Sequence, residues 1–313
     1  MNRNEQLKKH LDREMCGIEI GPWCHPVVPK SEGYNCLVMD VFDTETLKER
    51  AKVDLGSDDA KIDCIEEVDV LSTCSCIAEN VKSDHDLGTF DYILSSHNFE
   101  HLPDPITFLQ GCSKVLKPDG ILSMAIPDKR GCFDLFRPHS TVAQMLSAFF
   151  EKRERPTHEQ IFERWAMHAR KVSEGNEAIS FPISTPLDEI VPFDSLKDAY
   201  DGWVEAIKEE KSDYVDTHCW VFAPSSFELI INDLCYFGLI DFQLVEIITG
   251  GGGEFVAHLQ NSKDVSSFED YPSARVKILH RIQREICCHF SRNSTLRGSP
   301  GISLFRRVLR RFI

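Results

Sequence analysis

The chain has 313 residues, 42% of them hydrophobic and 27% charged, which is enough for one buried core of about 150–200 residues plus appended segments. Its formal net charge of −15 argues against a nucleic acid as the main partner, because phosphate binding needs a basic face. No apolar run reaches the roughly 20 residues that a membrane-spanning helix needs.

The N-terminus is polar and lacks the apolar core of a secretion signal, so we expect a cytoplasmic protein. In that compartment the cysteines are expected to be reduced, packed thiols. They form no pair of Cys-X-X-Cys knuckles, which argues against a structural zinc site. Residues 4–13 predict a short polar helix.

The first 127 residues alternate short apolar runs with amphipathic segments. The apolar runs predict strands at residues 15–20, 34–40, 68–71, 90–96 and 121–126. Helices are predicted at residues 44–53 and 103–116, the second ended by Pro118 and Gly120. Strands that alternate with helices of this length are typical of βαβ units in a mostly parallel sheet.

After residue 139 the sequence becomes charged and helical. Helices are predicted at residues 141–153, 158–174 and 195–211, with a loop at 175–195. We interpret residues 140–215 as a helical insertion over the open edge of the sheet, serving either as a lid or as an interface.

The sheet resumes after the insertion. A helix ending at Phe237 precedes two predicted strands, at residues 242–248 and 254–259, which four glycines separate. An antiparallel hairpin here would complete the sheet. The sequence therefore predicts an α/β, Rossmann-like fold with a seven-stranded, mostly parallel sheet and an antiparallel last strand.

The C-terminal tail is strongly basic, since residues 273–313 carry ten Lys and Arg residues against one acid, Glu285. Residues 302–313 are amphipathic at helical spacing. One interpretation is that this tail lies on an anionic membrane surface or docks on a partner enzyme. The other is that it neutralises the acidic body of the protein.

Acidic residues stand near the ends of the first three predicted strands: Glu19, Asp40 and Asp69. In a doubly wound sheet, a carboxylate ending the second strand can bind both hydroxyls of a ribose, and one ending the third can accept from the adenine amine. Gly21 allows a ligand to approach the backbone. Because this loop has only one glycine, it favours an adenosyl ligand over a pyrophosphate.

These features resemble the class I S-adenosylmethionine-dependent methyltransferases over about residues 15–127. The resemblance is carried by Glu19-Ile20-Gly21-Pro22, Asp40, Phe90-Asp91-Tyr92-Ile93, Asn98-Phe99-Glu100-His101-Leu102-Pro103-Asp104-Pro105 and Val115-Leu116-Lys117-Pro118-Asp119-Gly120. A narrower likeness, in the segments around Lys30, Asp128, Asp134 and His218, is to a bacterial subgroup. Its members often accompany or are fused to glycosyltransferases in surface-polysaccharide gene sets.

The resemblance implies S-adenosylmethionine as cofactor. It places Glu19, Gly21 and Pro22 by the methionine and adenosine portions, Asp40 on the ribose and Asp69 near the adenine. Ser96 and His97 follow the fourth strand, where the sulfonium and the acceptor meet.

Methyl transfer to an alcohol also requires removal of a proton. His97 and His101 lie four residues apart, and either is a candidate base. Asp128 follows the fifth strand, and Asp216 and His218 are expected to close over the acceptor. The alternative is that His97, His101, Asp128 and His218 bind a divalent metal. Their spacing matches no recognised ligand pattern, so we assign no residue to a metal.

The sequence therefore predicts an S-adenosylmethionine-dependent O-methyltransferase acting on a saccharide or a saccharide precursor. Two alternatives stay open: a methyltransferase for another polar small molecule, and an inactive methyltransferase-fold module beside a glycosyltransferase. The expected parts are a cofactor-binding half (1–139), the insertion (140–215), the final strands (216–262) and a basic helical tail (263–313). With the tail on a membrane, the protein would lie at the inner face.

Overall fold

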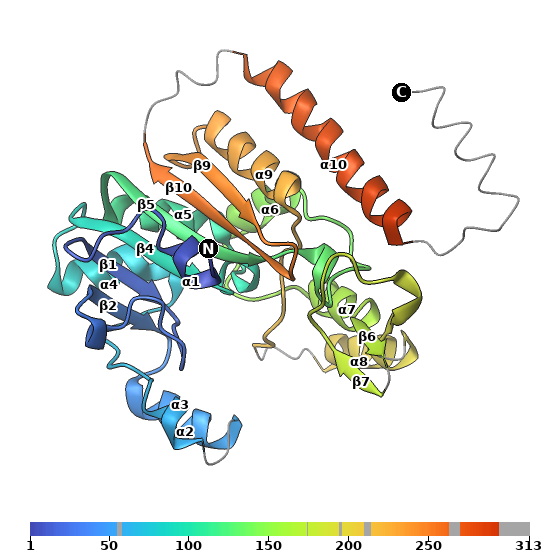
Figure 1. Cartoon of the computed structure of the whole chain (residues 1–313), viewed down its shortest axis with the longest axis horizontal. Coiled ribbons are helices and arrows are strands. Elements are labelled where there is room, and N and C mark those ends of the chain that lie inside the picture. Colours follow the sequence, from blue (N-terminus) through green and yellow to red (C-terminus); the bar gives the residue numbers. More distant parts are fainter. Residues whose placement is uncertain (55–57, 174, 194–195, 210–213, 263–269, 294–313) are drawn as a thin grey trace, which may run out of the picture.

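The computed structural model of the chain describes residues 1–54, 58–173, 175–193, 196–209, 214–262 and 270–293. Its main element is a seven-stranded sheet with the strand order β3-β2-β1-β4-β5-β10-β9 (Figure 1). The strands are β1 Cys16–Ile20, β2 Asn35–Asp40, β3 Val70–Leu71, β4 Phe90–Ser96, β5 Leu116–Pro127, β9 Phe242–Thr249 and β10 Glu254–Asn261. β10 is antiparallel to β5 and β9, and the other neighbours are parallel. This confirms the predicted fold class.

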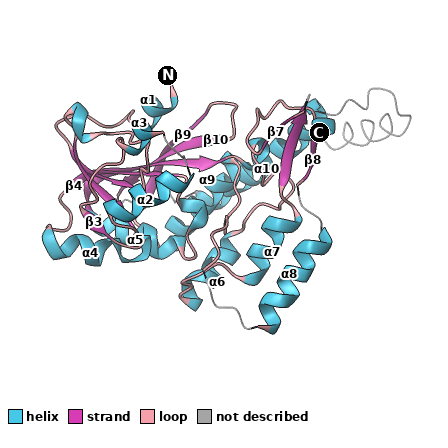
Figure 2. Ribbon diagram, turned by 90° about the horizontal axis from the view of Figure 1, so that it is seen from below, coloured by secondary structure: helices cyan, strands magenta, loops and turns pink. Residues whose placement is uncertain are grey.

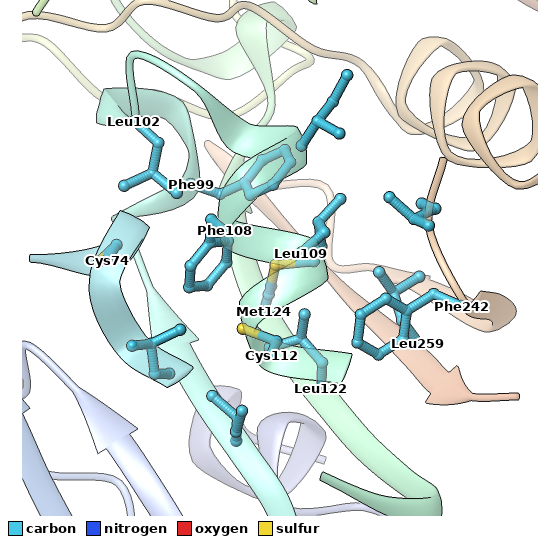
Figure 3. Close-up of a cluster of buried hydrophobic side chains, with 14 of the residues drawn as sticks. Cys74, Phe99, Leu102, Phe108, Leu109, Cys112, Leu122, Met124, Phe242 and Leu259 are labelled. Carbon is cyan, nitrogen blue, oxygen red and sulfur yellow. The ribbon is translucent and has the colours of Figure 1, made fainter. Parts of the chain in front are cut away.

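One face of the sheet is covered by helices. These are α4 Ile77–Asp84, α5 Pro105–Val115 and α9 Pro224–Tyr236, joined by α6 Val142–Glu151. Helix α5 begins where Asp104 accepts the Thr107 amide and Pro105 fixes the first turn. Figure 3 shows Phe108, Leu109 and Cys112 of α5 among the other side chains of this core, which include Leu122 and Met124 of β5.

The opposite face near β1 is covered mainly by a loop. The connection from β1 to β2 contains only a 3-10 turn, Lys30–Glu32, in place of a crossover helix. Val27 and Val28 of this loop pack with Leu7 of helix α1 Arg3–Leu7 and with Tyr92 of β4. The short helices α2 Thr44–Asp54 and α3 Asp59–Ile62 follow β2 and are offset from the sheet (Figure 1).

The insertion forms a lobe beside the main sheet, as Figures 1 and 2 show. It contains α7 His158–Ala166 and α8 Leu196–Lys208 together with a three-stranded sheet of order β7-β6-β8. The three strands are β6 Ala169–Ser173, β7 Asn176–Ala178 and β8 Ile190–Pro192.

The prediction is therefore wrong for residues 167–173, where a helix was expected to continue, and for residues 176–178 and 190–192, where a loop was expected. Ala169 and Ile190 are instead buried with Leu135 and Phe181 in a small separate core. Strands of three to five residues carry too few side chains to show a period in the sequence.

The C-terminal part begins with helix α10 Tyr271–Asn293, which packs on α9. Tyr271 and Arg275 both donate hydrogen bonds to the buried Asp233 of α9. The predicted amphipathic segment at residues 302–313 lies outside the described residues. Among the residues that the structure describes, no helix is long and apolar enough to cross a membrane.

The packing of Tyr92 over Gly17 of β1 gives a stability prediction. A Cβ added at Gly17 would lie 2.1 Å from Cε2 of Tyr92, whose side chain is fully buried. We expect Gly17→Ala to destabilise the protein by about 1–3 kcal/mol, since the ring must shift within a packed core. The measurement is the thermal unfolding midpoint.

Gly202 in α8 is a matched control, because an added Cβ would meet no atom within 4 Å. Gly202→Ala should leave the midpoint unchanged or raise it, since alanine is favoured in a helix by about 1 kcal/mol. An unchanged midpoint for Gly17→Ala would contradict the packing described.

Candidate active site

Glu19 anchors the loop that follows β1. Its side chain is buried, with Oε1 accepting the Val27 amide at 2.7 Å and Oε2 accepting the Val28 amide at 3.2 Å. Burial raises the pKa of this carboxyl to about 7, although the two amides act in the opposite direction. Glu19 therefore shapes the loop at the C-terminal edge of the sheet, and its carboxylate faces protein.

Gly21 and Asp40 border the same space at this edge. Gly21 has a φ of +59°, which favours glycine, and its amide donates to the Met39 carbonyl of β2. A Cβ added at Gly21 would lie 4.0 Å from Oδ2 of Asp40 and, among the described residues beyond its chain neighbours, closer to no other side chain. Oδ1 of Asp40 accepts the Phe42 amide, and burial raises the pKa of this carboxyl. Pro22 continues the turn, since its carbonyl accepts the His25 amide.

Asp69 lies before β3, whereas the sequence placed it at the end of that strand. Its Oδ2 accepts the Val38 amide at 2.7 Å and the Lys30 ammonium at 2.5 Å. The position after β3 belongs to the buried Ser72, whose amide donates to the Asp40 carbonyl. Sequence reasoning missed Ser72 because β3 has only two residues, too few to define its end.

Ser96 and His97 lie beside this space, because Ser95 of β4 pairs with Ile20 of β1. The Ser96 hydroxyl accepts a hydrogen bond from Arg3, whose Nε lies 2.7 Å from Oε1 of Glu254. Nε2 of His97 lies 2.8 Å from Oε2 of Glu254. Sequence reasoning missed Arg3 and Glu254, which are 251 residues apart in the chain.

His97 is held in a strained backbone conformation, with a φ of +50°. Burial lowers the pKa of its imidazole, but the carboxylates of Glu100 and Glu254 outweigh that effect and raise it to about 9. His97 is therefore predominantly protonated at neutral pH in the free protein.

His97, Glu100, His101 and His218 form one group, which we call the imidazole cluster. Oε1 of Glu100 lies 3.4 Å from Nδ1 of His97, 3.8 Å from Nε2 of His218 and 3.9 Å from Nε2 of His101. The rings of His101 and His218 meet edge to face, with centroids 4.7 Å apart. The structure thus brings together three of the four predicted catalytic residues. Sequence reasoning missed Glu100, although it directly precedes His101.

Carboxylates outside the cluster orient two of its histidines. Nδ1 of His101 lies 2.8 Å from Oδ1 of Asp216, and Nδ1 of His218 lies 2.5 Å from Oδ2 of Asp134. Asp134 also forms a buried ion pair with Arg137, which donates to the His218 carbonyl. Burial raises the pKa of the Asp134 carboxyl, but His218 and Arg137 reverse this and hold it below its usual value.

Asp128, the fourth predicted catalytic residue, is not part of this cluster. Its side chain is fully buried, and both oxygens accept hydrogen bonds from Arg130. The neighbouring Lys129 donates to the Leu135 carbonyl. The carboxylate of Asp128 and the ammonium of Lys129 are therefore bonded to groups of the protein itself.

Comparison with known families supplies an independent assignment. Residues 5–232 match the family model described as a methyltransferase domain. The chain belongs to this family. The prediction of a methyltransferase is confirmed, and the assignment supports S-adenosylmethionine as its cofactor. No protein with a curated description matches the chain.

Solved structures of methyltransferases resemble the chain more distantly. An S-adenosylmethionine-dependent methyltransferase from Methanosarcina mazei has 11% identity and a TM-score of 0.40, over 82% of this chain and 97% of that one. One from Mesorhizobium loti has 11% identity and a TM-score of 0.39, over 82% and 97%. One from Aquifex aeolicus has 14% identity and a TM-score of 0.37, over 83% and 89%. The family assignment rests on the sequence match.

The raised pKa of Glu19 gives a pH prediction. Because its folded-state pKa of about 7 exceeds the ordinary value of 4.5, the stability contributed by its protonated form is complete below pH 4.5 and is lost as the pH rises through 7. Between pH 4.5 and pH 8, we expect the free energy of unfolding of wild type to fall by about 3 kcal/mol relative to that of Glu19→Gln. Urea unfolding of both proteins across this range measures the difference, and a difference that does not vary with pH would contradict it.

Proposed function

We propose that the chain transfers a methyl group from S-adenosylmethionine to a hydroxyl of a polar acceptor, a saccharide or a saccharide precursor. The observation that carries this proposal is the imidazole cluster, three of whose members directly follow β4, beside the space bordered by Gly21 and Asp40. Such a cluster offers hydrogen-bonding groups to a hydroxyl-rich acceptor, and it would disfavour an apolar one.

The residues at the edge of the sheet fit an adenosyl ligand. Asp40 would accept hydrogen bonds from the ribose hydroxyls, with Gly21 leaving room for the sugar. Ser72, next to Asp40 along the edge, is our candidate for the adenine. At the other end of the space, Arg3 is close enough to Glu19 and Glu254 to interact with both charges, and it would bind the methionine carboxylate.

Bound S-adenosylmethionine supplies a methyl group activated by the adjacent sulfonium. The chain's own residues align the acceptor oxygen with that methyl group, since the reaction is an in-line displacement. A bond forms from the acceptor oxygen to the methyl carbon as the carbon–sulfur bond breaks, and the hydroxyl proton passes to a neutral imidazole of the cluster. His97, which is protonated in the free protein, must release its own proton before it can take this role. His97 and His101 are its solvent-accessible members, with side chains 47% and 27% exposed.

The choice of a saccharide as the acceptor rests on the resemblance of the sequence to the polysaccharide-associated subgroup. The same resemblance motivates a glycosyltransferase partner, and the basic tail motivates a contact with the membrane. One observation favours the non-catalytic alternative. The β1–β2 connection lacks a helix, so the amides of a helix N-terminus are missing from the place where nucleotides are often bound. Binding of S-adenosylmethionine distinguishes the proposed enzyme from the non-catalytic alternative.

Asp40 provides the binding test. We expect calorimetry to detect S-adenosylmethionine and S-adenosylhomocysteine binding to wild type, and Asp40→Ala to weaken both roughly 10- to 100-fold through lost hydrogen bonds to a charged group. Asp43→Asn is the matched control, because Asp43 caps α2 through the Thr46 amide and asparagine caps equally well. No binding to wild type, or full binding to Asp40→Ala, would contradict the proposed site.

The histidines provide the test of turnover. With tritiated methyl donor and polysaccharide or sugar nucleotides as acceptors, His97→Asn and His101→Asn should each lower the rate, by up to about 10²–10⁴-fold for the residue that takes the proton. The exposed His280 of α10 serves as control through His280→Asn. Full turnover in both cluster variants would show that neither histidine is the base. Transfer to non-hydroxyl acceptors alone would exclude a saccharide as the acceptor.

A further inference from the structure

Glu100 is the least expected residue of the imidazole cluster. Its side chain is 1% exposed, and within the described residues neither carboxylate oxygen has a hydrogen-bond partner. Its backbone carbonyl accepts the Cys219 and Trp220 amides, which fixes residues 99–101 against the segment that carries His218. A buried carboxylate without hydrogen bonds is costly unless a positive charge lies close to it.

The two neighbouring histidines are oriented toward Glu100. In both His101 and His218, Nδ1 is bonded to a carboxylate and Nε2 faces Oε1 of Glu100. When one ring nitrogen of a histidine binds a metal, the other nitrogen commonly donates to a carboxylate. That hydrogen bond fixes the orientation of the ring and its tautomer. The carboxylates here, Asp216 and Asp134, come from two separate segments.

The spacing of the three inner residues fits one cation. Their ligand atoms all lie within 4.8 Å of one another. Ligands bound to one ion at about 2.0–2.2 Å stand roughly 3–4 Å apart. The 3.8 Å and 3.9 Å separations from Glu100 Oε1 to the two Nε2 atoms lie within this range.

We propose that Glu100, His101 and His218 bind a divalent transition-metal cation. Two imidazoles and one carboxylate suit zinc, cobalt or manganese, and they leave coordination positions for water or an acceptor oxygen on the side of His101, the most exposed of the three. Its role, which rests on the proposed function, is to bind the acceptor hydroxyl and make it more acidic. With the cation bound, both ring nitrogens of His101 are engaged, so the hydroxyl proton would pass to His97 in its neutral form.

A second group with similar residues lacks this arrangement. His10, Glu246 and His258 also lie close together, but the Lys9 ammonium is 2.6 Å from Oε2 of Glu246 and His10 is bonded to Oε1. A cation of the protein thus already neutralises that carboxylate. Glu246→Gln is therefore a matched control for a change at Glu100.

The test measures metal binding without methyl donor or acceptor. Protein treated with a chelator is titrated with Co²⁺, followed by its visible absorption, and with Zn²⁺ by calorimetry. We expect one bound ion in wild type and in Glu246→Gln, and loss of both signals in Glu100→Gln. Asp216→Asn, at a side chain that is 69% exposed, should weaken binding roughly 10- to 100-fold by releasing His101.

Each outcome decides the proposal. If wild type takes up neither metal, or if Glu100→Gln binds as tightly as wild type, the site is wrong, and protonated imidazoles alone balance Glu100. If Glu100→Gln fails to fold, unchanged affinity in Asp216→Asn overturns the proposal and weakened affinity supports it. Because the readout needs no catalysis, metal binding without methyl transfer would reject the proposed function and retain the cation site.

Discussion

The hydrogen bonds from the Val27 and Val28 amides to the buried Glu19 carboxylate hold the cofactor side of the structure together. They fix a loop where a βαβ unit usually has a helix. With the loop fixed, Val27 and Val28 cover the sheet together with Leu7, and Gly21 turns toward Asp40. A carboxylate in this position serves the fold first, because its two oxygens are used before any ligand arrives.

The imidazole cluster depends on a different constraint, because charged side chains from distant segments meet at one edge of the sheet. Arg3 comes from α1, His97 and Glu100 follow β4, His218 precedes α9, and Glu254 begins β10. The buried ion pair of Asp134 and Arg137 holds His218 by its ring and by its backbone carbonyl. The imidazole cluster is therefore complete only when both halves of the chain have folded.

The sheet was predictable from the sequence, since alternating strands and helices and the four-glycine hairpin specify the parallel strands and the reversed β10. The strands of the insertion were not, because their burial comes from long-range contacts of Ala169 and Ile190. His97, His101 and His218, which were singled out by their types and positions, lie close together in the structure. Asp69 and Asp128 show the limit of such reasoning, because the Val38 amide and Lys30 bind one oxygen of Asp69, and Arg130 binds both oxygens of Asp128. The role of Glu100 follows from burial, which the sequence does not reveal.

The central claim is that an adenosyl cofactor occupies the space between Gly21, Asp40 and His97. A crystal structure of the protein with S-adenosylhomocysteine tests it most directly. We predict the ribose hydroxyls on the Asp40 carboxylate, the adenine beside Ser72 and the sulfur directed at the imidazole cluster. A ligand bound elsewhere, or bound here without contact to Asp40, would contradict this account.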